Sequence, residues 1–173
     1  SQTFVATGHD QYGEVFSTTV AWSVSGGGSI VDAPAVPTGN LALGRPAIAS
    51  SVGVAQFTPA LAVDGNAATR WSSAYTDPQW ISVDLGGVYT VSRVVLNWEW
   101  AYGRAYQIQV SMDAQSWTTV FSESNGNGGL DDITFPGTPA RYVRMNGTQR
   151  GLPYGYSLWA FEVYGLTHGS VYT

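Results

Sequence analysis

The sequence predicts an all-β domain, a sandwich or a barrel, and three observations lead to that prediction. Apolar residues alternate with polar residues wherever a period is visible, which is typical of strands that bury one face. A helical period of about 3.6 residues does not extend beyond one turn anywhere in the chain. Clusters of Gly, Pro, Asn and Ser separate these short segments at the spacing typical of all-β domains.

The N-terminal residues 1–38 contain two strand-like segments, Thr3 to Thr7 and Thr18 to Ser25, joined by a turn at Asp10 to Gly13. They resemble strands of bacterial immunoglobulin-like modules. A complete sandwich of that kind needs about seven strands and about 100 residues. We therefore interpret residues 1–38 as a β-hairpin fragment of such a module, or as a hairpin packed on the main domain. Val31 to Gly39 is interpreted as a linker or as an extended crossing segment.

The strands of the main domain follow in order. Ile81, Val83 and Leu85 alternate with Ser82 and Asp84, which gives this segment one apolar and one polar face. The same alternation predicts strands at Val94 to Trp98 and Tyr106 to Val110. Further strand candidates are Trp117 to Phe121, Asp132 to Phe135, Arg141 to Thr148 and Ser157 to Tyr164.

Turns and one short helix separate these strands. Ser124 to Gly129 and Pro136 to Pro139 have the residue types of turns. Ala60 to Ala68 allows at most one helical turn. We expect the domain to span residues 39–165 and residues 166–173 to form a tail that extends a strand or remains free.

Five tryptophans are predicted to belong to the core rather than to a binding surface. Trp98 shares its parity with Val94 and Leu96. The other four lie on or beside strand patterns: Trp71, Trp80, Trp117 and Trp159.

Composition excludes several classes of function. The chain has 173 residues, seven arginines, no lysine, no cysteine and a formal net charge of −5. Because the arginines are dispersed, they form no basic stripe for phosphates, so we expect no nucleic-acid partner. The absence of cysteine excludes thiolate chemistry and zinc knuckles. No apolar run approaches the ~18 residues of a membrane span, and the start, Ser1 to Phe4, has no signal-peptide pattern. We expect the chain to be cut from a longer, secreted or cell-surface protein.

Four motifs from Asn40 onward resemble the discoidin (coagulation factor 5/8 C-type) domain, in its branch of bacterial family 32 carbohydrate-binding modules. They are Asn40–Pro46 (NLALGRP), Ala62–Ser73 (AVDGNAATRWSS), Gln79–Gly86 (QWISVDLG) and Gly155–Gly165 (GYSLWAFEVYG). The resemblance implies an eight-stranded jelly-roll β-sandwich with a galactose-binding-domain-like fold, in agreement with the strand pattern. Animal members have a cysteine pair that this chain lacks.

The loop Asp64-Gly65-Asn66, read alone, is a turn whose carboxylate accepts hydrogen bonds from backbone N–H groups. The resemblance implies instead a structural calcium ion, which prefers about six to eight oxygen ligands. The implied ligands are the carboxylates of Asp64 and Glu162, the hydroxyl and carbonyl of Thr69, and the carbonyls of Leu61, Asn66 and Phe161. We expect such an ion to tie this loop to the last strand.

A sugar site needs aromatic surfaces for C–H faces and charged groups for hydroxyls. Leu96 to Glu99 and Tyr154 to Trp159 resemble segments of modules appended to bacterial chitosanases and 1,3-glucanases. That resemblance implies sugar contacts from four residues: Arg70, Tyr75, Glu99 and Tyr154. To these we add three on neighbouring loops, of which Trp100 and Tyr102 are expected to be exposed and Arg150 is equally compatible with an ordinary solvated role.

The expected ligand is a polysaccharide, most simply a 1,3-linked glucan. Chitosan-binding relatives carry an additional Glu after the Ser-Ser of the first strand, whereas Ser50 to Val54 has no acid, so chitosan comes second. Glycoside hydrolysis needs two carboxyl groups, and the proposed site contains only Glu99. We therefore predict a non-catalytic module that holds a covalently linked polysaccharide-degrading enzyme on its substrate.

The alternative is a cell-surface adhesion module for terminal galactose-type sugars, a protein or an anionic phospholipid. The loop Val52 to Phe57 offers apolar residues to a membrane but contains no lysine or arginine, which disfavours a membrane partner.

Overall fold

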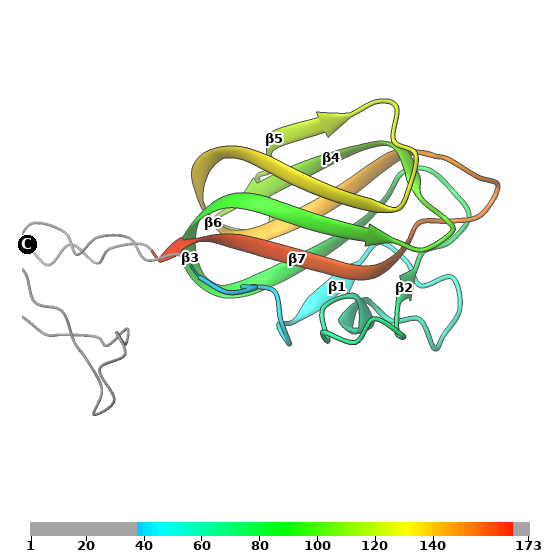
Figure 1. Cartoon of the computed structure of the whole chain (residues 1–173), viewed down its shortest axis with the longest axis horizontal. Coiled ribbons are helices and arrows are strands. Elements are labelled where there is room, and N and C mark those ends of the chain that lie inside the picture. The colour runs from blue at the N-terminus through cyan, green and yellow to red at the C-terminus, as the bar shows by residue number, and fades with distance from the viewer. Residues whose placement is uncertain (1–37, 168–173) are drawn as a thin grey trace, which may run out of the picture. The chain divides into compact units, whose positions relative to one another are not determined.

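The computed structural model describes residues 38–167 (Figure 1). The predicted hairpin fragment and residues 168–173 of the predicted tail lie outside this part of the chain. The described residues form antiparallel strands and one short 3₁₀ helix. In chain order these elements are β1 (Ala47–Ala49), η1 (Pro59–Ala62), β2 (Trp71–Ser72), β3 (Gln79–Trp98), β4 (Gly103–Ser111), β5 (Thr118–Glu123), β6 (Leu130–Arg150) and β7 (Ser157–Thr167).

Strands β3 and β6 bend and take part in both layers of a sandwich (Figure 1). The segment Gln79–Asp84 pairs with β1 on one side and with the end of β6 on the other. The segment Tyr89–Trp98 pairs with β7 and with the start of β6. The register shifts between the two segments, where Gly86 has a φ of 78° that favours glycine. One layer thus contains β1, β4 and β5, and the other contains β2 and β7.

The predicted all-β sandwich is confirmed. The number of strand segments also agrees with the eight strands that the family resemblance implies, when the two bent strands are each counted as two. With β3 and β6 each divided into two segments and the two-residue β2 left aside, the described residues contain eight strand segments. The alternation of Ile81 to Leu85 and of Val94 to Trp98 is confirmed as strand, although both segments belong to β3. The predicted short helix is also confirmed as η1, which begins with a proline.

The predicted turn at Pro136 to Pro139 is wrong, because these residues lie within β6. Thr138 and Pro139 pair with Val91 and Thr90 of β3. A proline donates no hydrogen bond to the ladder, but it is tolerated where a strand bends and the pairing is already irregular. The predicted turn at Ser124 to Gly129 does connect β5 with β6, and its last two glycines adopt positive φ.

The core lies between the layers and contains the inward-facing residues of both. It includes Ile81, Val83, Leu85, Leu96, Ile108, Val143, Met145, Leu158 and Phe161. Trp71 and Trp98 are buried in this core as predicted. Trp80, Trp117 and Trp159 are only half-buried, so that part of the prediction is wrong.

The outward direction of these tryptophans explains their exposure. Trp80 has the parity of Ser82 and therefore points away from the core residue Ile81. The guanidinium of Arg144 lies over the ring of Trp117, with 4.2 Å between its central carbon and the ring centroid. The rings of Trp80 and Trp117 therefore cover the outer surface of the sheet rather than fill the interior, whereas that of Trp159 lies near the guanidinium of Arg70, 5.9 Å from its central carbon.

The first described residues lie beside the end of β7. The backbone N–H of Thr38 donates to the carbonyl of Gly165 at 3.0 Å, and that of Leu41 donates to Val163 at 2.7 Å. Strand β7 continues to Thr167, two residues beyond the predicted boundary at residue 165. Among the described residues, no helix is long and apolar enough to cross a membrane.

Candidate functional site

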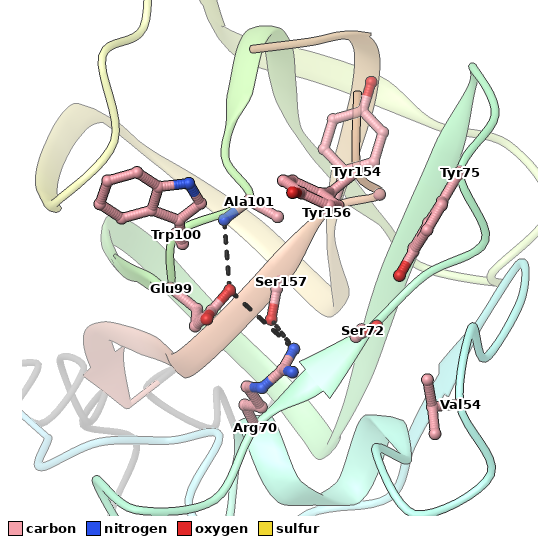
Figure 2. Close-up of a pocket in the computed structure, with 11 residues that line it drawn as sticks. Val54, Arg70, Ser72, Tyr75, Glu99, Trp100, Ala101, Tyr154, Tyr156 and Ser157 are labelled. Atoms are coloured by element: carbon pink, nitrogen blue, oxygen red, sulfur yellow. Dashed lines mark hydrogen bonds and ion pairs between the residues drawn. The ribbon is translucent and has the colours of Figure 1, made fainter. Parts of the chain in front are cut away.

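Five connections meet at one end of the sandwich and surround an open hollow of about 330 Å³ (Figure 2). They are the β1–η1, η1–β2, β2–β3, β3–β4 and β6–β7 connections, and the last residue of β2 and the first residue of β7 also line the hollow. The lining residues are Val54, Arg70, Ser72, Tyr75, Glu99, Trp100, Ala101, Tyr154, Gly155, Tyr156 and Ser157. Five of the seven predicted sugar contacts thus line the hollow, namely Arg70, Tyr75, Glu99, Trp100 and Tyr154.

Arg70 is held at the hollow by a hydrogen bond and an aromatic ring. Its Nη1 donates to Oγ of Ser157 at 2.7 Å, and this hydroxyl donates in turn to the carbonyl of Trp71 at 2.9 Å. The guanidinium carbon of Arg70 also lies 3.8 Å from the ring centroid of Phe57. A planar cation with several N–H donors is thereby fixed in one orientation before any ligand binds.

Glu99 supplies the acceptor that complements Arg70 (Figure 2). Its Oε2 lies 4.0 Å from Nη1 of Arg70 and accepts a hydrogen bond from the backbone N–H of Ala101 at 3.2 Å. The two side chains are 22% and 24% exposed, so a ligand can reach both. At this exposure the ion pair contributes little to stability, but both groups can form charge-assisted hydrogen bonds with hydroxyls.

Three exposed aromatic rings border these charges. Tyr75 is 54% exposed, Tyr154 51% and Trp100 74%. The rings of Tyr75 and Tyr154 meet edge to face, with centroids 6.0 Å apart and planes at 85°. Figure 2 shows Trp100 on the side of Glu99 and the two tyrosines on the other side. The hollow therefore combines apolar faces with a central donor and acceptor.

Two residues predicted to contact sugar do not line the hollow. Tyr102 is half-buried and packs beside Gly128 and Gly151; a Cβ on Gly151 would lie only 2.2 Å from its ring. The expectation that Tyr102 is exposed is therefore wrong. The Arg150 guanidinium donates to the Asp77 carboxylate and to the Tyr75 carbonyl, and it does not line the hollow.

The sequence-based selection omitted several lining residues. Ser157 orients Arg70, and the ring of Tyr156 forms part of the wall although the residue is fully buried. Tyr156 and Ser157 directly follow Tyr154 in the sequence. The resemblance of this segment to sugar-binding modules indicates that it contributes to a site, but it does not indicate which of its side chains face that site. Val54 lies in the loop Val52 to Phe57, whose sequence suggests only a membrane contact, and nothing in the sequence indicates its position at the hollow.

The predicted calcium loop gathers oxygen atoms. Oδ2 of Asp64 accepts a hydrogen bond from Oγ1 of Thr69 at 2.7 Å, and Oδ1 accepts from the N–H of Asn66 at 2.8 Å. The hydroxyl of Thr69 also lies 2.9 Å from the carbonyl of Asn66. A carboxylate, a carbonyl and a hydroxyl therefore converge in one loop, and these are oxygen donors of the kind that calcium prefers.

The other implied ligands come from packed elements. Leu61 lies in η1, which packs against β7, the strand that contains Phe161 and Glu162. Oε2 of Glu162 accepts a hydrogen bond from the hydroxyl of Tyr164 at 2.7 Å. No cluster of three or more His, Cys, Asp or Glu side chains occurs between residues 38 and 167. A calcium site here would thus depend on backbone carbonyls as well as on the two carboxylates.

Comparison with known proteins shows the family. A family model described as NedA-like, galactose-binding domain, of the F5/8 type C kind, matches residues 61–145. Chitosan-binding module 1 from a chitosanase/glucanase of Paenibacillus sp. IK-5 is 56% identical, with a TM-score of 0.72 over 74% of this chain and 100% of that chain. Module 2 of the same enzyme, solved in complex with chitotriose, is 55% identical, with a TM-score of 0.71 over 73% and 100%.

More distant relatives extend this picture. The family 32 module of Clostridium perfringens NanJ, solved with galactose, is 24% identical and shares the fold, with a TM-score of 0.65 over 75% of this chain and 99% of that chain. Polysaccharide lyase 8 family protein HylA from Enterococcus faecalis (strain ATCC 700802 / V583) is 36% identical over 117 residues. The match covers 63% of this chain, which spans only 8% of the length of that protein.

The chain belongs to the F5/8 type C family of galactose-binding-like domains, as the motifs from Asn40 onward indicated. The solved relatives of highest identity described above are carbohydrate-binding modules and not catalytic domains. The prediction of a non-catalytic carbohydrate-binding module is therefore confirmed at the level of class.

Proposed function

We propose that the hollow binds a polysaccharide built from glucose-type units, and that the module thereby holds an attached polysaccharide-degrading enzyme on its substrate. The observation that carries this proposal is the oriented pair Arg70 and Glu99, bordered by three exposed aromatic rings. The pair offers donors and an acceptor to sugar hydroxyls, and the rings offer apolar faces to C–H groups. Tethering then raises the local concentration of substrate around the enzyme.

A neutral glucan is the ligand that best matches the charge of the hollow. Among its lining residues Glu99 is the one acid and Arg70 the one base, and they lie 4.0 Å apart. Because the two charges compensate each other, the hollow favours hydroxyl groups over a charged substituent. The likeness to modules of 1,3-glucanases supports a 1,3-linkage.

Chitosan is the second candidate, and the relatives are what favours it. Modules that are 55% and 56% identical to this chain are described as chitosan-binding. The ammonium group of a glucosamine unit would have to share Glu99 with Arg70. No lining residue other than Glu99 offers a carboxylate, so each bound unit would lose part of the ionic attraction.

The loop of Asp64 would hold a structural calcium ion. The carboxylates of Asp64 and Glu162, the hydroxyl of Thr69 and the carbonyls of Leu61, Asn66, Thr69 and Phe161 would supply oxygen ligands. The convergence of Asp64, Asn66 and Thr69 supports this assignment. The ion would supply positive charge that fastens the loop to β7, and it would take no part in sugar binding.

The attached enzyme and the location follow from the same proposal. The relative in E. faecalis is a polysaccharide lyase, and the solved modules come from a chitosanase/glucanase. An insoluble polysaccharide is encountered outside the cell, so the longer protein would be secreted or displayed on the cell surface.

Retention on insoluble polysaccharides tests the proposed function. The native chain, Glu99→Gln and Tyr154→Ala would be mixed with 1,3-glucan, chitosan and cellulose, and the bound fraction would be measured. Glu123→Gln is a matched control, because this carboxylate lies on β5 and does not line the hollow. We expect retention of the native chain and of the control, and loss in both variants.

Retention on 1,3-glucan but not on chitosan would support the neutral ligand, and the reverse would select the second candidate. Absence of retention on all three, combined with binding to terminal galactose or to phosphatidylserine vesicles, would contradict the proposal and favour an adhesion module.

A further inference from the structure

Arg150 and Asp77 connect the two loops that carry Tyr75 and Tyr154. Nε of Arg150 donates to Oδ2 of Asp77 at 3.2 Å, which links the end of β6, next to the β6–β7 connection, to the β2–β3 connection. Nη1 of the same guanidinium donates to the carbonyl of Tyr75 at 2.5 Å and lies 3.3 Å from the carbonyl of Tyr154. One side chain therefore contacts the backbone of both tyrosines.

Tyr156 completes this connection from inside the fold. Its hydroxyl donates to Oδ1 of Asp77 at 2.5 Å, so the Asp77 carboxylate accepts from Tyr156 on one oxygen and from Arg150 on the other. The ring of Tyr156 is fully buried and is packed against Gly147 so closely that a Cβ there would lie 2.2 Å from it. Asp77 is thus anchored to a residue that cannot move without disturbing the core.

The same two loops are joined a second time, nearer to β2. The N–H of Ser73 donates to the carbonyl of Tyr156 at 2.9 Å, and the N–H of Tyr156 donates to Oγ of Ser73 at 2.8 Å. A Cβ on Gly155 would lie 2.5 Å from the carbonyl of Ser73, so the two backbones approach closely there. The loops that carry Tyr75 and Tyr154 are therefore held together at two points, one at Arg150 and Asp77 and the other at Ser73 and Tyr156.

We propose that Arg150 and Asp77 are positioning residues for carbohydrate binding, which set the edge-to-face arrangement of Tyr75 and Tyr154 and do not touch the sugar. This proposal rests on the proposed function of the hollow. The side chain of Arg150 is partly exposed, at 24%, but its donors are directed to Asp77 and to backbone carbonyls. Preorganised aromatic rings bind a ligand more tightly because less conformational freedom is lost on binding.

The geometry can be tested without any ligand. In the native chain, nuclear Overhauser contacts between the ring protons of Tyr75 and Tyr154 should be present, since the centroids are 6.0 Å apart. We expect these contacts to be lost in Arg150→Lys and Asp77→Asn, because lysine lacks the fork of donors and asparagine lacks the charge. Arg141→Lys is the matched control, since it weakens an Arg–Asp pair of the same kind with Asp84, whose residues do not line the hollow.

The effect on binding is tested by a double-mutant cycle with a soluble oligosaccharide of 1,3-glucan and with chitotriose, measured well below the melting temperature. Arg150→Lys and Asp77→Asn should weaken binding by about tenfold in the native background and much less in a Tyr75→Ala, Tyr154→Ala background. Arg141→Lys should lower the melting temperature without changing the affinity.

Additive losses in the two backgrounds would overturn the proposal, because they would mean that Arg150 contacts the sugar directly. Ring contacts that persist in both variants would overturn it as well. A native chain that binds no saccharide would contradict the proposed function of the hollow, and the ring contacts would still decide whether Arg150 and Asp77 arrange the tyrosines.

Discussion

The guanidinium of Arg70 lies over the ring of Phe57, with its central carbon 3.8 Å from the ring centroid. The face of an aromatic ring attracts a cation, so Phe57 holds Arg70 in the orientation in which Nη1 meets Ser157. Phe57 itself does not line the hollow. It therefore acts on the ligand only through Arg70.

Substitution of Phe57 should reveal this indirect action. Phe57→Leu keeps an apolar side chain but removes the π face, so we expect affinity for the polysaccharide to fall about two- to fivefold. Isothermal titration with a soluble oligosaccharide measures the change. In an Arg70→Ala background the same substitution should have no further effect, and a loss of the same size there would contradict the interpretation.

Trp98 and Trp100 should respond in opposite ways to substitution. Trp100 is 74% exposed, so Trp100→Ala should reduce binding and leave the free energy of unfolding within about 0.5 kcal/mol of the native value. Trp98 is 3% exposed and its Nε1 donates to Oδ2 of Asp131 at 2.7 Å. Trp98→Phe should cost about 2–4 kcal/mol of stability, from the lost volume and the lost hydrogen bond. Urea unfolding and retention assays on both variants check the contrast.

A carboxylate introduced at Val54 should shift the ligand preference. Val54 lines the hollow and is 37% exposed, so a longer acidic side chain there can reach a bound sugar. We expect Val54→Glu to raise the affinity for chitosan relative to glucan by about tenfold, and Val54→Gln, which has the same shape without the charge, to leave the ratio unchanged. Competition between the two polysaccharides measures the ratio. An equal rise for both ligands would argue against a charge effect.

The proposed calcium site predicts that a chelator destabilises the module. An ion bound only by the folded state stabilises it by mass action, so addition of a chelator should lower the melting temperature by several degrees. Asp64→Asn should melt at this lower temperature with or without chelator, because the proposed ligand carboxylate is lost. Differential scanning fluorimetry gives both values, and elemental analysis gives the bound metal. A native melt that does not respond to the chelator would contradict the assignment.

The pair of Asp84 and Arg141 predicts a loss of stability in acid. Two hydrogen bonds from Arg141 at 2.9 and 2.8 Å lower the pKa of Asp84 below its ordinary value of 3.8. Because the folded-state pKa is the lower one, this contribution is fully present above the unfolded pKa and disappears as pH falls through the folded pKa. The stability difference between the native chain and Asp84→Asn should therefore be constant near neutral pH and shrink below about pH 4. Unfolding in urea at several pH values measures it.

Alternation predicted the strands well, and it failed where a strand continues through residues that usually end one. Ile81 and Val94 belong to the same long β3, and Pro139 lies inside β6. A local pattern cannot show that both layers share a strand, since that depends on pairing with residues far away in the sequence. The same limit explains why Trp80, with a large apolar side chain, covers an outer surface instead of filling the core.

Residue types and their positions in the loops were sufficient to predict most side chains of the candidate site. Arg70, Tyr75, Glu99, Trp100 and Tyr154 meet at the hollow, as their chemistry and the family resemblance suggested. Tyr102 lies in the same loop as Glu99, and Arg150 ends β6 next to the loop of Tyr154, but their side chains turn toward Gly151 and Asp77. Which way such a side chain turns depends on the packing space and on the partners behind the loop, and neither can be read from one sequence.

Thr38 and Gly165 lie side by side at the end of the domain away from the hollow. The described chain begins and ends near this point, where the N–H of Thr38 donates a hydrogen bond to the carbonyl of Gly165. Ser157, at the other end of β7, borders the hollow, and eight residues of extended strand separate it from Gly165 by roughly 26 Å. The described part of the chain therefore begins and ends on the side of the domain away from the hollow. The hollow would thus be free to lie against the proposed polysaccharide without hindrance from residues 38 and 167, where the described domain begins and ends.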